Sequence, residues 1–225
     1  MKITIINGSP RKNGSTYKIL AYFYELLSNY ISSGSIEFIN LIDLNINFCI
    51  GCQSCHRTGI CVILEDRVEE IHDLIKDSDG LILGSPTYNS NVTGLFKSFY
   101  DRVHMTLEQL LYHKPCVIIV TYENMDGSKS LKILKEMVMN AGGYVIAQML
   151  IKNDSYYSDP LTEINKEKIE KAVKLLINEM QKNTPPLLSR VYRKVALRFL
   201  LKRYIYKDKE HNLGIIKKWV EKRLI

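Results

Sequence analysis

The stretch KITIINGSPRKNGST (residues 2–16) joins an apolar run to the start of a helix through a loop of glycine, proline and hydroxyl residues. The run at residues 2–7 is short and ends at Gly8, a pattern typical of a buried strand. Residues 15–31 then carry apolar side chains at helical spacing. We therefore predict a strand, a loop and a helix in that order, with the loop at the carboxyl end of a buried strand.

The same alternation continues along the chain. Four further apolar runs predict strands at residues 36–42, 80–85, 116–122 and 144–150. Helical periodicity predicts helices at residues 68–75, 93–111, 130–139 and 162–181. Because the strands are too continuously apolar to have one wet face, they predict a doubly wound parallel α/β sheet. Such sheets bind ligands beyond the carboxyl ends of their strands, here in the loops after Asn7, Ser85 and Tyr122.

Composition separates a neutral body from a basic tail. The chain of 225 residues is 46% hydrophobic and 24% charged, which excludes a disordered protein. Residues 184–225 hold 12 Lys and Arg against 3 Asp and Glu, a net charge of +9, whereas residues 1–183 carry −2. Two prolines in NTPP (residues 183–186) end the preceding helix. We therefore predict a main domain at residues 1–183 and a basic extension at 184–225, with helices at 187–206 and 215–224.

The extension has three interpretations. It can be an arm that packs on the domain or on a second subunit, an amphipathic helix that binds an anionic membrane surface, or a nucleic-acid contact. No recognised nucleic-acid fold accompanies the basic residues, which disfavours the last. No apolar run reaches the roughly 18–20 residues needed to span a bilayer, and the N-terminus lacks a secretory signal. We therefore expect a cytoplasmic protein whose thiols stay reduced.

The loop GSPRKNGST (residues 8–16) has the composition of a phosphate cradle. Its glycines let backbone N–H groups converge, and a helix N-terminus adds partial positive charge. Ser9, Ser15 and Thr16 add hydroxyl donors, and Arg11 adds a charged fork. Neither the Walker pattern nor G-x-G-x-x-G is present. A plain strand–helix turn with a Ser or Thr cap is the alternative interpretation.

Two segments together resemble the NADPH-dependent FMN reductase superfamily. The strand–GSPRKNGST–helix unit resembles its phosphate loop, and GSPTYNSNVTGLFKSFYDR (residues 84–102) resembles its second flavin loop and the helix that follows. The resemblance covers roughly residues 1–180. It implies a flavodoxin-like five-stranded parallel sheet of order 2-1-3-4-5, here with a C-terminal helical extension, and it implies bound FMN.

The resemblance also implies which residues contact FMN. The phosphate is expected at Ser9, Arg11, Asn13, Ser15 and Thr16. The ring is expected against Pro86, Thr87, Tyr88, Asn89 and Asn91. Tyr122 is a further candidate, although its surroundings, TYENMDGS (residues 121–128), depart from the family's glycine-containing stretch. No catalytic side chain is predicted, because the hydride chemistry belongs to the cofactor.

The stretch CIGCQSCHRTGIC (residues 49–61) holds four cysteines, Cys49, Cys52, Cys55 and Cys61. Runs of C-x2-C-x2-C commonly supply three ligands of an iron–sulfur cluster, and the fourth cysteine would close a [4Fe–4S] cubane. Structural zinc prefers two separated C-x2-C pairs, and disulfides at this spacing are crowded and disfavoured in the cytosol. His56, in the same loop, is a possible ligand, but we expect it to be a solvated histidine. We expect Cys116 to be a small buried hydrophobe.

Within the superfamily the cysteine loop resembles that of the iron–sulfur flavoprotein subgroup, in spacing and in its position after the second strand. Clusterless relatives carry a similar loop, C-x-G-C-x-x-C…G-x-C followed by two acidic residues. This chain also matches that pattern, through Gly51, Gly59 and the pair Glu65–Asp66. The sequence therefore leaves a [4Fe–4S] cluster and a set of reduced cysteines as alternatives.

The resemblance implies an FMN oxidoreductase. NAD(P)H or a low-potential protein would supply electrons, and a quinone, nitro compound, free flavin or other acceptor would take them. The alternative is an electron-transfer protein that relays electrons between the [4Fe–4S] cluster and FMN without NAD(P)H. A thiol-based redox sensor is a weaker third hypothesis. Relatives are commonly dimers or tetramers, so a homo-oligomer is expected.

Overall fold

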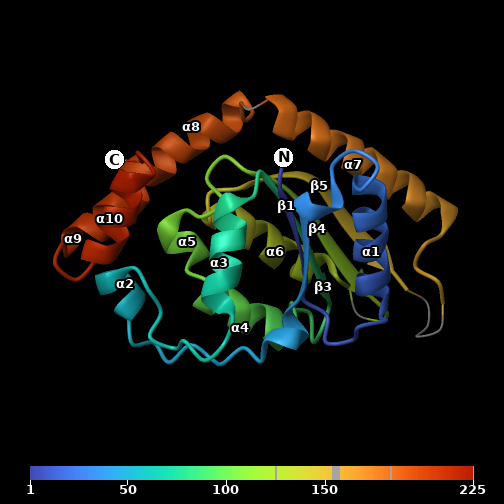
Figure 1. Ribbon diagram of the computed structural model, residues 1–225, viewed down its shortest axis with the longest axis horizontal. Coiled ribbons are helices and arrows are strands. Elements are labelled where there is room, and N and C mark those ends of the chain that lie inside the picture. Colours follow the sequence, from blue (N-terminus) through green and yellow to red (C-terminus); the bar gives the residue numbers. More distant parts are fainter. Residues whose placement is uncertain (125, 154–157, 183, 225) are drawn as a thin grey trace.

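A computed structural model describes residues 1–124, 126–153, 158–182 and 184–224 (Figure 1). Its centre is a five-stranded sheet of order β2-β1-β3-β4-β5 in which every neighbouring pair is parallel. The strands are β1 Ile3–Asn7, β2 Ile36–Asn40, β3 Gly80–Pro86, β4 Pro115–Tyr122 and β5 Tyr144–Lys152. The predicted flavodoxin-like sheet and its strand order are confirmed.

The strand order reverses beside β1, and this reversal positions the site. β1 pairs with β2 on one side and with β3 on the other, so Asn7 lies between Asn40 and Gly84. The chain runs from β1 to β2 on one side and from β3 to β4 on the other side. The loops after β1 and β3 therefore diverge, and a crevice lies between them. Every residue of β1 is buried, because helices cover both faces of the sheet.

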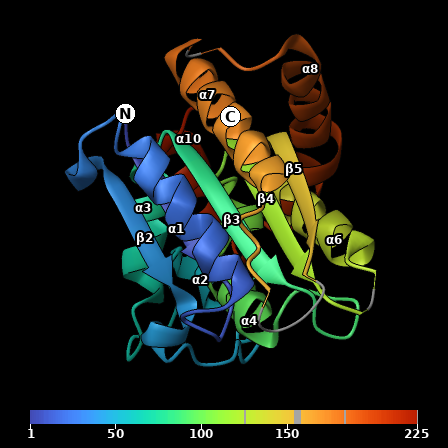
Figure 2. The ribbon, with the colours of Figure 1, turned by 90° about the vertical axis from the view of Figure 1, so that its right-hand side faces the viewer.

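Helices cover the two faces of the sheet (Figures 1 and 2). On one face α1 (Ser15–Leu27) and α7 (Glu163–Lys182) enclose a core that includes Ile19, Phe23 and Leu176. The other core lies under α3 (Val68–Asp77), α4 (Gly94–Arg102), α5 (Met105–Glu108) and α6 (Ser128–Asn140). Each of these helices presents an apolar stripe to the sheet, as the helical periodicity predicts.

The single helix predicted at residues 93–111 is wrong. The structure divides it into α4 and α5, separated by Val103 and His104. His104 has a φ of 52° and Gln109 a φ of 52°, and this left-handed backbone cannot continue an α-helix. The cysteine stretch is not entirely loop, because it contains the short helix α2 (Ser54–Thr58). Short 3-10 helices lie at Ser33–Ser35 and Leu41–Leu44, and the second of them ends the strand predicted at 36–42.

The C-terminal extension is helical, as predicted. α8 (Leu187–Val195), a π-helical segment (Ala196–Leu201) and α9 (Lys202–Lys207) follow one another, and α10 (Leu213–Glu221) then returns to the body. A third apolar cluster, Leu197, Ile205, Ile215 and Trp219, packs against Leu107 and Tyr112 of the main body. Residue 183, the predicted domain boundary, lies outside the described residues, so the division into 1–183 and 184–225 stays a prediction. In the described ranges, no helix has the length and apolar character to cross a membrane.

Candidate functional site

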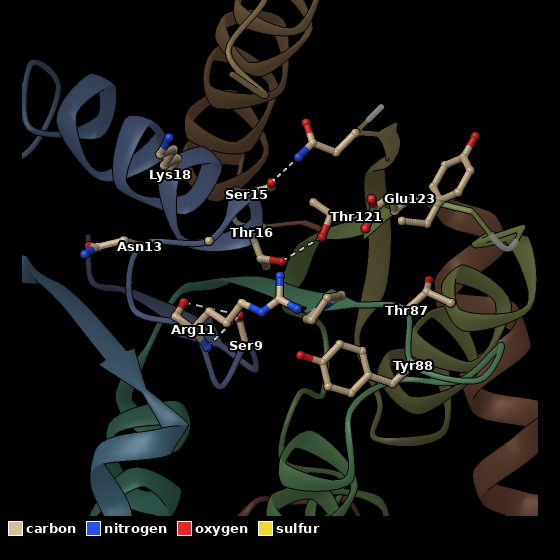
Figure 3. Close-up of a pocket in the computed structure, with 14 residues that line it drawn as sticks. Ser9, Arg11, Asn13, Ser15, Thr16, Lys18, Thr87, Tyr88, Thr121 and Glu123 are labelled. Carbon is tan, nitrogen blue, oxygen red and sulfur yellow. Dashed lines mark hydrogen bonds between the residues drawn. The ribbon is translucent and has the colours of Figure 1, made fainter. Parts of the chain in front are cut away.

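A cavity of about 300 Å³ opens beyond the carboxyl ends of β1, β3 and β4 (Figure 3). It lies at the reversal of strand order, where doubly wound sheets bind ligands. Every predicted FMN contact lines it except Asn89 and Asn91. The predicted contacts that it gathers are Ser9, Arg11, Asn13, Ser15, Thr16, Pro86, Thr87, Tyr88 and Tyr122.

One end of the cavity is the N-terminus of α1. This helix begins after Gly14 with no side-chain cap and no acidic residue in its first turn. The first N–H groups of a helix have no intrahelical acceptor, and the helix dipole makes this end partly positive. Ser15 and Thr16 present hydroxyl groups here, held by Asn153 Nδ2 at 2.7 Å and Thr121 Oγ1 at 2.8 Å. This end is therefore built to bind an anion.

Neighbouring residues fix the shape of the loop after β1. Asn7 is buried, donates to Asn40 Oδ1 at 2.9 Å, and accepts from the Ser9 backbone N–H at 3.1 Å. The Gly8 carbonyl accepts from Thr93 Oγ1 at 2.7 Å. A Cβ on Gly8 would lie 2.4 Å from the ring of Phe96, so a larger residue cannot replace it without a shift. Contacts within the protein itself therefore hold this loop in shape.

The opposite side of the cavity is formed by the loop after β3. The Thr87 backbone N–H donates to Thr121 O at 2.8 Å, which ties this loop to β4. The Thr87 hydroxyl is buried and has no hydrogen-bond partner among the described residues. The ring of Tyr88 is 40% exposed and reaches into the cavity, as does Arg11 from the other loop (Figure 3).

Asn89 and Asn91 do not line the cavity, because they build the turn that carries Tyr88. Tyr88 and Asn91 exchange two backbone hydrogen bonds of 2.9 and 3.0 Å. Asn89 and Ser90 occupy the tip with φ values of 49° and 61°. Asparagine tolerates this left-handed backbone better than most residues, which explains its place there. Their contact with FMN stays a prediction.

The cavity has further lining residues that were not predicted from the sequence, namely Gly14, Lys18, Thr121, Glu123 and Asn153. Thr121 is the penultimate residue of β4, and Asn153 comes directly after β5. The rule that ligands lie beyond the carboxyl ends of the strands therefore contained the signal for both.

The four cysteines of the loop form a second site. Together with Arg102 and His104 they line a small cavity of about 30 Å³, and none of them is in a disulfide. Cys49 and Cys52 are exposed, Cys55 is half-buried and Cys61 is buried. Burial raises the pKa of the Cys55 thiol, and the nearby thiols of Cys61, Cys49 and Cys52 raise it further. All four cysteines therefore border one small cavity.

Arg102 holds the two ends of the cysteine loop. Its buried guanidinium donates to Asn47 O at 3.0 Å and to Ile63 O at 2.9 Å, and its Nε lies 3.2 Å from Cys61 Sγ. It also forms a forked ion pair with Asp66 at 2.8 and 3.0 Å. Burial alone would raise the pKa of Asp66, but hydrogen bonds from Arg102 and the Asn47 backbone hold that pKa below its ordinary value.

The predictions for His56 and Cys116 have different outcomes. His56 is half-buried, and its Nδ1 lies 2.8 Å from Asn212 Oδ1, so the solvated histidine expected in the loop is wrong. Cys116 is fully buried in β4, as predicted, and burial raises the pKa of its thiol to about 12.

The similarity of this chain to known proteins identifies its family. The model for NADPH-dependent FMN reductases matches residues 1–155. This chain belongs to the NADPH-dependent FMN reductase family. An iron–sulfur flavoprotein of Clostridioides difficile (strain 630) is 47% identical over 226 residues, covering 100% of both chains. The chain is therefore a flavoprotein of the iron–sulfur subgroup, and in general terms an FMN-binding oxidoreductase.

Two further relatives of this FMN reductase family member match less of the chain. An iron–sulfur flavoprotein of Methanocaldococcus jannaschii is 42% identical over 103 residues, 45% of this chain and 51% of that one. The solved structure of an FMN-dependent NADH-azoreductase from Bacillus anthracis str. Ames Ancestor, in complex with FMN, matches with a TM-score of 0.60 and 20% identity. It covers 77% of this chain and 98% of that one, and it shows the shared fold.

Three features of the cavity of this flavoprotein fit FMN. The uncapped N-terminus of α1 supplies donors for a phosphate, and the buried Thr87 hydroxyl has no partner among the described residues. A polar group buried in this way costs free energy unless a ligand or water satisfies it. The Tyr88 ring adds an aromatic surface for a planar ligand.

The cysteine loop of this flavoprotein fits an iron–sulfur cluster through the chemistry of its donors. All four are thiols, the ligand type that such clusters use, and the Arg102 guanidinium beside Cys61 offsets negative charge on the sulfur. Across the described part of the chain, no three His, Cys, Asp or Glu side chains form a group that could hold a single metal ion. A cubane spreads its thiolates around a larger core than one ion, so the two observations are compatible.

Proposed function

We propose that this flavoprotein is an NAD(P)H-dependent oxidoreductase that holds FMN in the cavity beyond β1, β3 and β4. The observation that carries the proposal is the cavity itself, which joins an uncapped helix N-terminus to an aromatic ring across the strand-order reversal. The family description, NADPH-dependent FMN reductase, supports the nicotinamide donor.

Different residues of the cavity would contact different parts of FMN. Ser9, Ser15 and Thr16 present hydroxyls to the phosphate, and Arg11 brings a cation to it. Thr87 and Tyr88 face the ring, the first as a polar contact and the second as an aromatic one. FMN, when bound, supplies the redox centre, and the protein orients it and tunes its electronics. In this proposal a small quinone, nitro compound or free flavin accepts the electrons.

The second part of the proposal is a [4Fe–4S] cluster at Cys49, Cys52, Cys55 and Cys61. Its support is the lining of one small cavity by all four cysteines, the subgroup of the full-length relative and the guanidinium beside Cys61. We place the protein in the cytoplasm, because five free cysteines need a reducing compartment.

A second candidate function is an electron-transfer protein that relays electrons between the [4Fe–4S] cluster and FMN without NAD(P)H. The observation that favours it is the exposure of Cys49 and Cys52, which would leave one edge of a cluster accessible to a partner protein. A low-potential protein would then replace the nicotinamide as donor.

One anaerobic experiment tests the proposal and its alternative. The purified protein is analysed for FMN, iron and acid-labile sulfide, and its absorption spectrum is then followed during titration with NADPH, NADH or reduced ferredoxin. Bleaching of the flavin by a nicotinamide supports the reductase, and bleaching by ferredoxin alone supports the relay. Absence of FMN after reconstitution with the free cofactor would overturn both functions, and absence of iron would remove the cluster.

A further inference from the structure

The C-terminal extension touches the cysteine loop backbone to backbone. Gly214 in α10 lies so close to α2 that a Cβ on it would be 2.1 Å from Gly59 N and 2.5 Å from the carbonyl carbon of Thr58. Gly59 itself has a φ of +81°, which favours glycine. The two segments are far apart in the sequence, and only residues without side chains allow this approach.

A polar contact accompanies the backbone contact. His56 Nδ1 lies 2.8 Å from Asn212 Oδ1. The Asn212 amide nitrogen donates to Ile205 O at 3.0 Å and to Asp208 O at 2.9 Å, so the turn between α9 and α10 fixes the direction of its oxygen. Among the described residues, this is the only hydrogen bond that joins a side chain of α2 to a residue outside the cysteine loop.

α10 is in turn anchored to the main body. Trp219 is fully buried, and its Nε1 donates to Leu107 O at 2.8 Å. The buried Glu108 carboxylate accepts from Lys218 of α10, and the Glu108 carbonyl accepts from Lys222 Nζ at 3.0 Å. α10 is therefore tied to the main body by buried contacts, and α2 packs against it.

The two supports of the loop act on different cysteines. Arg102 fixes the loop ends and Cys61, as described above. Cys55 lies on α2 next to His56, and the Cys52 carbonyl accepts from Arg57 of the same helix at 3.2 Å. The positions of these two thiols therefore depend on where α2 lies, and α10 sets that place.

We propose that α10 is a clamp that holds Cys52 and Cys55 where they can bind the cluster together with Cys49 and Cys61. The proposal rests on the cluster of the proposed function, and it assigns the basic extension a role in cofactor retention. The positioning residues are Gly214 and Asn212, which act through Gly59 and His56.

Gly214→Ala tests the clamp with one added methyl group, and Gly34→Ala is its matched control. The methyl at position 214 meets the α2 backbone, whereas a Cβ at position 34 has nothing within 4 Å. Alanine is a better helix former than glycine, so loss of helicity in α10 cannot explain an effect. Overpacking of this kind shifts a docking equilibrium by about 5- to 150-fold. We expect the iron-to-FMN ratio of Gly214→Ala to fall severalfold, with FMN content and thermal stability of the body near those of Gly34→Ala.

Hydrogen exchange on the iron-free proteins separates the clamp from the cluster. We expect the amides of residues 49–60 to exchange faster in Gly214→Ala than in Gly34→Ala, while the amides of β1 and β3 do not change. Equal exchange in the two variants would overturn the clamp, whatever the iron content. Wild-type protein that takes up no iron would refute the cluster, and the exchange comparison would still decide the clamp.

Discussion

Arg11 and Lys12 are adjacent cations with different surroundings. Arg11 lines the FMN cavity, whereas Lys12 does not line it and pairs with Asp43 at 2.5 Å on the surface. A hydrogen bond to a charged group is worth about 1.5–3 kcal/mol, or about 10- to 150-fold in affinity. We expect Arg11→Ala to weaken FMN binding by about that factor and Lys12→Ala to leave it nearly unchanged. Titration of the apoprotein with FMN, followed by flavin fluorescence, measures both, and equal affinities would contradict the assignment.

Replacement of Arg102 should lower the free energy of unfolding. Arg102→Met removes the guanidinium that donates to Asn47 O, Ile63 O and Cys61 Sγ. It also leaves the buried Asp66 carboxylate without its cation. Breaking a buried ion pair in this way costs roughly 3–5 kcal/mol. We expect the free energy of unfolding of the apoprotein in urea to fall by about this amount.

Lys97→Met is the control for Arg102→Met. Lys97 lies on the same helix, α4, and its ion pair with Asp101 is exposed. Exposed pairs contribute about 0–1 kcal/mol, so this variant should unfold close to wild type. Comparable losses in the two variants would show that Arg102 has no special role in the loop.

Most single contacts of the cavity could be predicted from the sequence, because they lie in one continuous loop and one short motif. Asn89 shows the limit of such transfer. It lies in the predicted ring loop, yet its left-handed backbone directs it to the tip of a turn. Arg102 ends the motif at residues 84–102, but its partners Asn47, Ile63 and Cys61 are distant in sequence and follow no periodic pattern.

At the scale of elements, Glu108 links three parts of the fold. Its carboxylate faces His72 Nε2 of α3 at 2.8 Å, His104 Nδ1 at 3.5 Å and Lys218 of α10, and the Lys222 ammonium lies on its backbone carbonyl. Burial alone would raise the pKa of Glu108, but the nearby His104 imidazole and the hydrogen-bonded His72 and Lys218 side chains hold that pKa well below its ordinary value of 4.5.

The depressed pKa gives the docking of α10 a pH dependence. A carboxylate whose pKa is lowered in the folded state contributes stability above its unfolded pKa, and that stability is lost as pH falls below 4.5. Trp219, the single tryptophan of the chain, is buried against Leu107 and reports the docking by its fluorescence. We expect its emission in the apoprotein to shift to longer wavelength as pH falls through this range.

Variants of two glutamates check the source of that shift. Glu108→Gln should give emission that depends much less on pH below 4.5, because no carboxylate remains to protonate. Glu70→Gln, which removes an exposed partner of Arg67, should keep the wild-type dependence. An unchanged pH profile in Glu108→Gln would assign the shift to other groups.

The strands and most helices could be predicted, because buried strands and amphipathic helices carry local patterns. The break between α4 and α5 could not, because the apolar period runs through His104 and only the backbone angle there ends the helix. The packing of α10 on α2 could not be predicted from the sequence either. It depends on Gly214 and Gly59, whose missing side chains leave no pattern to detect.

In the whole molecule, α8 has an exposed apolar stripe. Leu187, Val191 and Val195 follow one another at intervals of four residues and are between 50% and 71% exposed. Contiguous apolar surface of this kind marks an interaction site. We expect the protein to be a homo-oligomer that buries this stripe, and light scattering after gel filtration measures its mass directly.

Two variants on α8 test that expectation. Val191→Ser with Val195→Ser should lower the oligomeric mass, and Lys194→Ser, on the same helix, should not, because it removes charge and no apolar area. A monomeric wild-type protein would contradict the expectation. If that monomer sedimented with phosphatidylserine vesicles, the membrane-surface interpretation of the basic extension would replace it.

The contact between α10 and α2 also orders events during synthesis. The cysteine loop leaves the ribosome long before α10 is translated, since about 150 residues separate Gly59 from Gly214. Until α10 has been translated and has docked, the nascent loop has thiols but no clamp. If the proposed clamp is right, the cluster forms only after α10 has emerged, and a chain truncated before Leu213 would keep the FMN cavity but retain little iron.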